Sequence, residues 1–435
     1  MAPNARTIPL PDAAPPAACR FCGSGLTYEA CDFGDQPLAN HIVPMEAPAE
    51  PDPRFPLRVM VCTACLLAQL EKTADPAMMF GEYTYLSSVS AFWREHAARF
   101  AGHATARFAL TNQSLVMEIG SNDGTTLSEF AARGIPCLGI DPAANVAAEA
   151  RRRGVPTLTA FFGERTAAAL LRDGNRADLL FANNVLGHVP ALLDCVRGLA
   201  LVLAPNGVLS IEVPHVLAML RGNQFDTVYH EHVFYFSASV LHRILGSAGL
   251  AIFDIELLPT HGGSLRIFAQ HAATGQHIVT AAPERIMADE RDAGLQTPER
   301  YRTLADAAAR VVRGLRGFLD RARADGATVA AYGAAAKGTM LLNAAGATEA
   351  DIRFVADANP LKQGNRVSGC RIPIVAPDRI RDARPDFVLV LPWNLADEIT
   401  RTLGFIAAWG GRFVIPSPEL RIIEATSNGK PVIAP

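Results

Sequence analysis

Four side chains that can carry or release protons stand in a row near the middle of the chain, in the segment 229–232 with the sequence Tyr-His-Glu-His. Three aromatic residues follow almost at once, namely Phe234, Tyr235 and Phe236. A buried core does not tolerate so many unpaired polar groups, and a surface loop has no need of so many aromatic side chains. A partly dry pocket in which protons move requires both. The segment therefore predicts a proton-transfer site.

The residue types of this segment suit different roles. Imidazole has an unperturbed pKa of about 6.5 and is mostly a free base at neutral pH, so a histidine can take a proton from a substrate. Tyr229 is better suited to donating a hydrogen bond to a developing oxyanion, and Glu231 can orient or perturb its neighbours. On an extended segment His230 and His232 would share one face. The spacing therefore leaves the choice between the two histidines open.

The same two histidines could instead bind a metal ion. His188, which follows a predicted strand, could join His230 and His232 as a third ligand. No other residue supplies the outer hydrogen bonds that metal-bound histidines normally receive. A metal-dependent enzyme is therefore the alternative, and proton transfer is the favoured interpretation.

Two C-x-x-C pairs near the N-terminus predict a zinc site. The first pair is Cys19 and Cys22, and the second is Cys62 and Cys65. Each pair lies on a tight turn that can direct both sulfurs at one ion, and four thiolates complete a tetrahedral zinc shell. Because no coordination position is left for water or substrate, we expect the zinc to be structural.

A strand followed by a glycine-rich turn predicts a cofactor site. The apolar strand ends near Glu118 and enters a turn that contains Gly120 and Gly124, after which residues 125–133 are expected to be helical. Such a turn lets a ligand approach the backbone closely. The acidic residue argues against a pyrophosphate and favours a cationic or hydroxyl-bearing ligand. Asp141 closes the next strand and is placed to accept both hydroxyls of a ribose.

Further strands extend this unit into a parallel sheet. A strand over 177–182 ends at Asn183, and another is expected over 207–213. Strands that alternate with helices predict a doubly wound parallel sheet with its ligand at the carboxyl ends of the strands. His188 lies at such an end, although a histidine there can also serve only for capping or packing.

The last third of the chain predicts a second nucleotide-type sheet. A strand over 328–332 leads into a turn of small residues, 333–338, and then a helix over 339–345. Lys337 in this turn suits an anion, but the small residues could equally serve tight helix–strand packing. One long amphipathic helix is expected before this sheet, over 298–325.

Composition limits the function classes. The 435 residues suggest two or three domains, and 49% of them are hydrophobic. A net charge of −3 gives no basic field for nucleic acid, and the apolar runs are too short for a membrane helix. The segment 1–17 reads as a disordered leader without a signal sequence. We therefore expect a cytoplasmic protein with reduced cysteines.

Taken together, the motifs resemble the S-adenosylmethionine-dependent C-methyltransferases of deoxysugar-nucleotide biosynthesis. The resemblance extends from Cys19 to Leu420. It rests on the order of several blocks: the two cysteine pairs, 118–124, 183–188, 229–237, 261–266, 332–338, 359–364 and 391–395.

The resemblance implies three domains. These are a zinc-binding module over 1–75, a class I methyltransferase domain with a Rossmann-like parallel sheet over 76–258, and a second Rossmann-like α/β domain over 259–435 that helps to hold a sugar nucleotide. The partner would be a nucleotide-linked keto-deoxysugar, on dTDP or another nucleotide, and the protein a monomer or weak homodimer. The implied reaction is methylation of a sugar carbon next to a ketone, commonly carbon 3 of a 4-keto-6-deoxy sugar.

The resemblance also assigns site residues. The cofactor S-adenosylmethionine would contact Glu118, Gly120, Ser121, Asn122, Gly124 and Asp141. We add Asn183 to this set. The proton-handling residues would be His188, Tyr229, Glu231 and His232, with His232 favoured as the base. We expect Tyr83, His261 and Lys337 to contact the substrate; the Tyr83 segment could also merely pack a domain junction. A non-catalytic sugar-nucleotide-binding protein is the other alternative, and the intact cofactor loop beside an intact base cluster argues against it.

Overall fold

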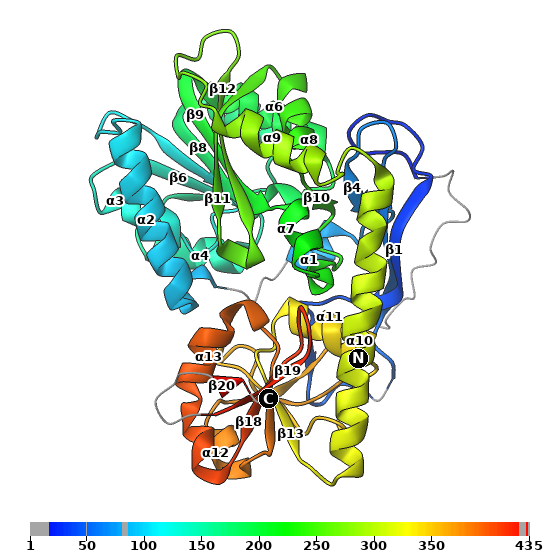
Figure 1. The fold of residues 1–435 in the computed structure, drawn as a ribbon. Coiled ribbons are helices and arrows are strands. Elements are labelled where there is room, and N and C mark those ends of the chain that lie inside the picture. The colour runs from blue at the N-terminus through cyan, green and yellow to red at the C-terminus, as the bar shows by residue number, and fades with distance from the viewer. Residues whose placement is uncertain (1–16, 49, 81–85, 426–431, 434–435) are drawn as a thin grey trace.

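The structure is a computed structural model that describes residues 17–48, 50–80, 86–425 and 432–433. Almost all of the expected leader lies outside these ranges. Three units built on separate sheets follow one another (Figure 1). Within the described ranges, no helix combines the length and apolar character needed to cross a bilayer.

The N-terminal unit contains short strands that form two small sheets with partners from elsewhere in the chain. The strands are β1 (Tyr28–Pro37), β2 (Ile42–Pro44), β3 (Arg54–Val61), β4 (Ala68–Leu70), β10 (Phe234–Tyr235) and β15 (Asn365–Val367). Four of them form an antiparallel sheet in the order β1-β3-β4-β10. Because β10 comes from the middle of the chain and β2 pairs with the distant β15, this unit is joined to both of the others.

The central unit is a seven-stranded sheet. Its strands are β5 (Val116–Ile119), β6 (Cys137–Asp141), β7 (Thr157–Thr159), β8 (Ala177–Asn183), β9 (Leu203–Pro214), β11 (Leu250–Leu258) and β12 (Ser264–His271). The order is β11-β12-β9-β8-β5-β6-β7, parallel from β9 to β7, with β12 antiparallel to both of its neighbours. The expected division after residue 258 would place β12 in the C-terminal domain, yet its backbone pairs within this sheet.

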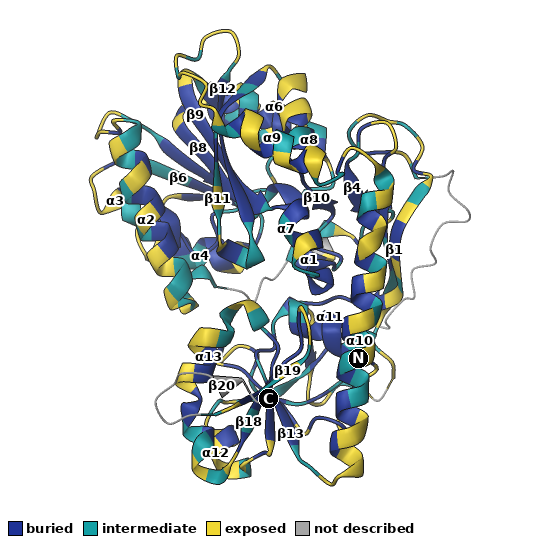
Figure 2. Cartoon of the chain, in the orientation of Figure 1, coloured by how far each residue is buried: buried dark blue, intermediate teal, exposed yellow. Residues whose placement is uncertain are grey.

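Helices cover both faces of the central sheet (Figure 1), and for that reason its middle strands are buried on both sides (Figure 2). The helices of this part of the chain are α1 (Pro76–Phe80), α2 (Ala91–Arg107), α3 (Thr125–Ala131), α4 (Ala144–Arg152), α5 (Glu164–Arg172), α6 (Leu192–Val202), α7 (Val216–Arg221), α8 (Ala238–Ser247) and α9 (Ala282–Asp292). Ser90 and Ser237 cap α2 and α8, since each hydroxyl accepts a hydrogen bond from a backbone N–H in the first turn.

The C-terminal unit is a second seven-stranded sheet in the order β16-β14-β13-β17-β18-β19-β20. Its strands are β13 (Val329–Tyr332), β14 (Val355–Ala356), β16 (Ile374–Val375), β17 (Phe387–Val390), β18 (Arg412–Ile415), β19 (Arg421–Glu424) and β20 (Val432–Ile433). Its helices are α10 (Thr303–Ala324), α11 (Ala336–Ala344), α12 (Arg379–Ala383) and α13 (Ala396–Thr402). The pairing is parallel as far as β18, whereas β19 and β20 are antiparallel.

The starts of two helices differ from the sequence expectation. The long helix predicted from residue 298 begins with a 3-10 turn, η5 (Pro298–Arg302), and becomes α-helical only at Thr303; such turns are common at helix N-termini. The helix expected from residue 339 begins earlier, at Ala336, so Lys337 lies in its first turn.

One apolar core runs through all three units. It contains Leu57 of β3, Phe225 before the Tyr-His-Glu-His segment, Leu315 of α10 and Leu389 of β17. Helix α10 passes from the N-terminal unit, where it packs on β1, to the C-terminal sheet (Figure 1). The position of the Tyr-His-Glu-His segment is therefore fixed by all three units.

Candidate active site and zinc centre

The four predicted zinc ligands come together at one end of the N-terminal unit. Their sulfur atoms all lie within 4.8 Å of one another, with Cys19 Sγ 3.5 Å from Cys65 Sγ and Cys22 Sγ 3.5 Å from Cys62 Sγ. Zinc–sulfur bonds of about 2.3 Å in a tetrahedron place the sulfurs about 3.8 Å apart, so the donor set fits zinc. Gln69 Nε2 donates a hydrogen bond to Cys19 Sγ at 3.2 Å, the kind of outer contact that orients a ligand.

Both other units hold the turn that carries the second cysteine pair. Arg243 Nη1 of α8 donates to the Cys65 carbonyl at 3.3 Å, and Tyr301 Oη of η5 donates to the Leu66 carbonyl at 3.3 Å. The metal-binding turn is thus a junction of the fold. With all four positions filled by thiolates, the site has the closed shell of a structural zinc centre.

The cofactor loop follows β5 and bends sharply. Gly120, Asn122 and Gly124 all have positive φ, at 67°, 49° and 75°. A Cβ on Gly120 would lie 2.4 Å from a methyl carbon of Val185, so no larger residue fits without rearrangement. This conformation brings the loop backbone to the carboxyl edge of the sheet, where the sequence predicts the ligand.

Asp141 at the end of β6 shapes this loop. Its Oδ2 accepts from the Asn122 N–H at 2.8 Å and its Oδ1 accepts from the Ala143 N–H at 2.9 Å. Burial raises the pKa of this carboxyl. Each carboxylate oxygen has a further lone pair that a ribose hydroxyl can use. Asp141 therefore combines the predicted ribose role with a loop-holding role that the sequence did not indicate.

Four buried polar atoms at this edge have no hydrogen-bond partner within the described residues: Glu118 Oε2, Ser121 Oγ, Asn183 Oδ1 and Asn184 Oδ1. An unpaired buried polar atom costs about 1–3 kcal/mol, so a cluster of them indicates a ligand site. Burial raises the pKa of Glu118 well above its usual range, and a bound cation would favour its charged form. The group fits S-adenosylmethionine, which carries a positive charge and several hydrogen-bonding groups.

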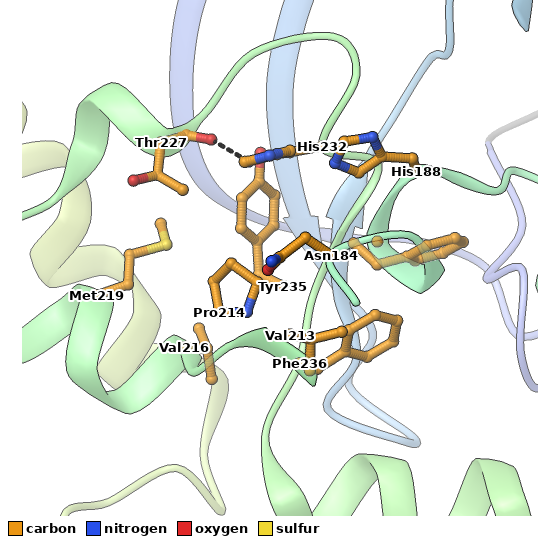
Figure 3. Close-up of a pocket in the computed structure, with 12 residues that line it drawn as sticks. Asn184, His188, Val213, Pro214, Val216, Met219, Thr227, His232, Tyr235 and Phe236 are labelled. Carbon is orange, nitrogen blue, oxygen red and sulfur yellow. Dashed lines mark hydrogen bonds between the residues drawn. The ribbon is translucent and has the colours of Figure 1, made fainter. Parts of the chain in front are cut away.

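A hydrogen-bonded chain fixes the orientation of His232. Its Nδ1 lies 2.7 Å from the Thr227 carbonyl oxygen (Figure 3). Because a carbonyl can only accept, Nδ1 carries the proton and Nε2 has the free lone pair. The Tyr229 hydroxyl donates to this Nε2 at 2.7 Å. Thr227 was not among the residues predicted from the sequence, although it lies two residues before Tyr229.

His188, the other histidine predicted to handle protons, lies beside His232. It ends the short 3-10 helix η2 (Leu186–His188) after β8, and its ring centroid lies 4.9 Å from that of His232. Burial, with a smaller effect of His261, lowers the pKa of His188 to about 4, and burial also holds the pKa of His232 well below its usual range. Both imidazoles are therefore neutral free bases at physiological pH.

The Tyr-His-Glu-His segment is a turn, and this overturns the extended arrangement considered above. The His232 N–H donates to the Tyr229 carbonyl at 2.9 Å, which places these two side chains on one side. His230 points elsewhere, with Nε2 donating to the Phe55 carbonyl at 3.1 Å. Within the described chain, the four cysteines are the one cluster of His, Cys, Asp or Glu arranged to hold a metal ion. A metal site of His188, His230 and His232 is therefore contradicted.

Glu231 faces the junction of the three units. Its Oε2 accepts a hydrogen bond from Asn40 Nδ2 of the N-terminal unit at 2.7 Å. Burial raises the pKa of Glu231 to about 7, and the positive charge of Lys362 from the C-terminal unit opposes this shift. The Glu231 carboxyl is thus bonded to Asn40 and not to the histidine pair, and its raised pKa lies near neutral pH.

Glu231→Gln is expected to remove part of the pH dependence of stability. The folded chain raises the pKa of this carboxyl from 4.5 to about 7, so its contribution to stability is fully present below about pH 4.5 and is lost as the pH rises through about 7. Gln still accepts from Asn40 but does not titrate. Urea unfolding should show the variant gaining stability relative to wild type between about pH 5 and about pH 8. A constant difference across that range would contradict a titrating, buried Glu231.

Lys337 and His261 approach the same cluster from other elements. Burial, followed by the charge of Lys337, lowers the pKa of His261 to about 4, and the same charge contributes to the low pKa of His232. Lys337 Nζ is buried without a hydrogen-bond partner in the described ranges and lies 4.6 Å from the Trp393 ring centroid. Trp393 Nε1 in turn donates to Asp226 Oδ2 at 2.6 Å. No role was predicted for Asp226 or Trp393, although Trp393 lies in the motif 391–395 and Asp226 lies three residues before Tyr229.

A small cavity of about 20 Å³ lies behind His232, lined by Asn184, His188, Thr227, Met219 and Tyr235 among others (Figure 3). It has room for about one water molecule and not for a sugar nucleotide. The expected substrate contact Tyr83 lies outside the described residues.

Three family descriptions match successive parts of the chain. Residues 19–80 match a "Putative zinc binding domain", residues 93–255 a "Methyltransferase domain", and residues 259–418 a "C-methyltransferase C-terminal domain". The C-methyltransferase NovU of Streptomyces niveus is 37% identical over 410 residues, which cover 94% of this chain and 97% of that protein. The chain belongs to the C-methyltransferase family.

This C-methyltransferase uses S-adenosylmethionine and has a four-cysteine zinc site. It is also 33% identical to the trans-aconitate 2-methyltransferase of Methylobacterium nodulans over 122 residues, 28% of this chain and 46% of that one. Among solved structures, the magnesium protoporphyrin IX methyltransferase ChlM of Synechocystis PCC 6803 with bound SAM is similar over 40% of this chain and 78% of that chain, at 17% identity and a TM-score of 0.32.

Proposed function

We propose that this C-methyltransferase transfers the methyl group of S-adenosylmethionine to the carbon next to the ketone of a nucleotide-linked 4-keto-deoxysugar, at carbon 3. The observation that carries the proposal is the chain from the Thr227 carbonyl through His232 to the Tyr229 hydroxyl. A methyltransferase that acts on carbon needs such a base, because a carbon next to a ketone is a poor nucleophile until it loses a proton. The motif order and the similarity to a C-methyltransferase support the carbon acceptor.

The resting hydrogen bonds suggest how the base is released. When the ketone enters, the Tyr229 hydroxyl transfers its hydrogen bond from His232 Nε2 to the ketone oxygen. The free Nε2 lone pair then takes the α-proton, and the electron pair of the broken C–H bond forms the enolate. Tyr229 and the neutral His188 donate hydrogen bonds to the enolate oxygen.

S-adenosylmethionine, when bound, supplies an electrophilic methyl group on a sulfonium. The enolate carbon would take this methyl group from the sulfonium sulfur, which would leave as a neutral thioether, and the ketone would be restored. His232 is left as an imidazolium. Because burial holds its pKa well below the usual range, it loses the extra proton readily and the free base is regenerated.

Other residues serve the two ligands in this proposal. The cofactor contacts Glu118, Ser121, Asn122, Asp141 and Asn183 at the carboxyl edge of the central sheet, with Gly120 and Gly124 giving it access to the loop backbone. The sugar nucleotide, on dTDP or another nucleotide, contacts Tyr83, His261 and Lys337. Support for Lys337 comes from its buried ammonium, which has no acceptor in the described part of the chain.

Asp141→Ala is expected to weaken S-adenosylmethionine binding by about 1–3 kcal/mol, the cost of leaving ligand hydroxyls unpaired and the loop unheld. Isothermal titration with the cofactor measures the change, and sugar-nucleotide affinity should barely move. Asp178→Ala is the matched control, because Asp178 Oδ2 also accepts from a backbone N–H, that of Leu115 at 2.8 Å, at the opposite end of the same sheet. Equal loss of both ligands would contradict a cofactor role.

A further inference from the structure

The C-terminal unit holds a buried carboxylate, Asp226, which lies just before the Tyr-His-Glu-His turn. Asp226 is fully buried, and its Oδ2 accepts from Trp393 Nε1 at 2.6 Å across a separation of 167 residues. Its Oδ1 has no hydrogen-bond partner within the described residues. A buried carboxylate that is only half satisfied costs stability, so packing alone does not account for it.

Asp226 is connected to the base through the backbone of Thr227. It lies in the 3-10 helix η3 (Phe225–Thr227), and the carbonyl of the next residue, Thr227, is the acceptor for His232 Nδ1–H. Asp226 and Thr227 share this 3-10 turn, which is closed by a hydrogen bond from the Val228 N–H to the Phe225 carbonyl at 2.9 Å, so anchoring Asp226 limits the backbone rotation that sets the direction of the Thr227 carbonyl. That carbonyl in turn determines which nitrogen of His232 carries the proton.

Residues around the hydrogen bond between Trp393 and Asp226 help to hold it in place. Lys337 Nζ lies 4.6 Å from the Trp393 ring centroid, and a cation near an indole face draws electron density from the ring, which makes the N–H a better donor. Burial raises the pKa of Asp226, while Lys337 and the Trp393 hydrogen bond oppose that rise. On the other side, Phe225 stacks on Phe33 of β1 with ring centroids 6.0 Å apart. Contacts from the C-terminal and N-terminal units therefore hold the turn at Phe225–Thr227 in place.

We propose that Asp226 and Trp393 are positioning residues, through which the C-terminal unit holds His232 in the tautomer that leaves Nε2 free to act as a base. The inference rests on the proposed role of His232, since it specifies how that base is held. It gives the C-terminal unit a part in proton removal in addition to its proposed part in holding the sugar nucleotide.

Trp393→Phe tests the proposal, because it keeps an aromatic ring near Lys337 and deletes only the donor to Asp226. With the full-length zinc-loaded protein labelled with ¹⁵N-histidine, long-range ¹H–¹⁵N correlation should show His232 as the Nδ1–H tautomer in wild type and as a tautomer mixture in the variant. With S-adenosylhomocysteine bound, exchange of the substrate α-hydrogen in heavy water should slow about 10- to 100-fold. The Michaelis constants for both ligands should stay within about 2-fold of wild type.

Trp409→Phe is the matched control, since Trp409 Nε1 donates to the Pro385 carbonyl at 3.0 Å within the same C-terminal unit and away from the turn. Asp226→Asn keeps an acceptor for Trp393 and should retain the tautomer better than Asp226→Ala. A wild-type tautomer and exchange rate in Trp393→Phe would overturn the proposal, as would a loss seen only in the Michaelis constant of the sugar. The base assignment is judged separately: if His232→Asn still exchanged normally while Trp393→Phe altered the tautomer, the base assignment would fail and the positioning link would stand.

Discussion

His232→Asn is expected to lose α-hydrogen exchange and methylation together, each by at least about 100-fold, the lower end of what a positioned general base contributes. An asparagine amide can still donate to the Thr227 carbonyl, so the turn should keep its shape, but no group remains to take the proton. The measurement is deuterium uptake at the carbon next to the ketone in heavy water, with S-adenosylhomocysteine bound, which separates proton removal from methyl transfer. Binding of both ligands should persist.

His230→Asn is the matched control for this substitution. His230 belongs to the same segment but bonds to the Phe55 carbonyl, away from the histidine pair, so its variant should exchange at nearly the wild-type rate per folded molecule. If His232→Asn exchanged at the wild-type rate and His230→Asn or Glu231→Gln did not, another residue would be the base.

Cys22→Ser is expected to release the zinc and to unfold the N-terminal unit. Structural zinc contributes an apparent binding free energy of about 10–16 kcal/mol in small domains, which is comparable with the entire stability of a domain, about 5–15 kcal/mol. Cys22 is the exposed member of the four, so replacing it by serine removes a ligand without disturbing the core. Zinc content by elemental analysis and the thermal unfolding midpoint should both fall.

The loss should extend to the active site. β10, which follows the Tyr-His-Glu-His turn, pairs with β4 of the zinc unit, and Asn40 of that unit donates a hydrogen bond to Glu231. Cys137→Ser is the control for loss of a thiol outside the metal site. A Cys22→Ser protein that lost zinc, stayed folded and lost only turnover would contradict a structural role for the metal.

Local patterns predict much of the fold. The apolar runs at 177–182 and 207–213 correspond to β8 and β9, and helical periodicity identified α10. Long-range strand pairing could not be predicted from the sequence. The residue types of Phe234–Tyr235 do not indicate that this strand joins the sheet that begins with β1 at Tyr28. The position of β12 in the central sheet is likewise decided by its partners and not by its own residues.

In the site, too, side-chain chemistry could be predicted from the sequence, whereas long-range contacts could not. Residue types indicated a base, an oxyanion donor and a four-cysteine zinc site, because those properties reside in the side chains. Which of His230 and His232 lies beside Tyr229 depends on backbone direction, and the turn at Tyr229 places His232 there. The contacts of Asp226 with Trp393 and of Asn40 with Glu231 span 167 and 191 residues, and a single sequence carries no signal for such pairs.

The most direct test of the account is the chemical position of the transferred methyl group. The protein is incubated with S-adenosylmethionine labelled with ¹³C in its methyl group and with a panel of nucleotide-linked 4-keto-deoxysugars, and the products are studied by carbon–proton correlation NMR. We expect a methyl group bonded to the ring carbon next to the ketone, with long-range correlations to the carbonyl carbon. A labelled methyl on oxygen or nitrogen, or no transfer across the panel although both ligands bind, would contradict the proposed reaction.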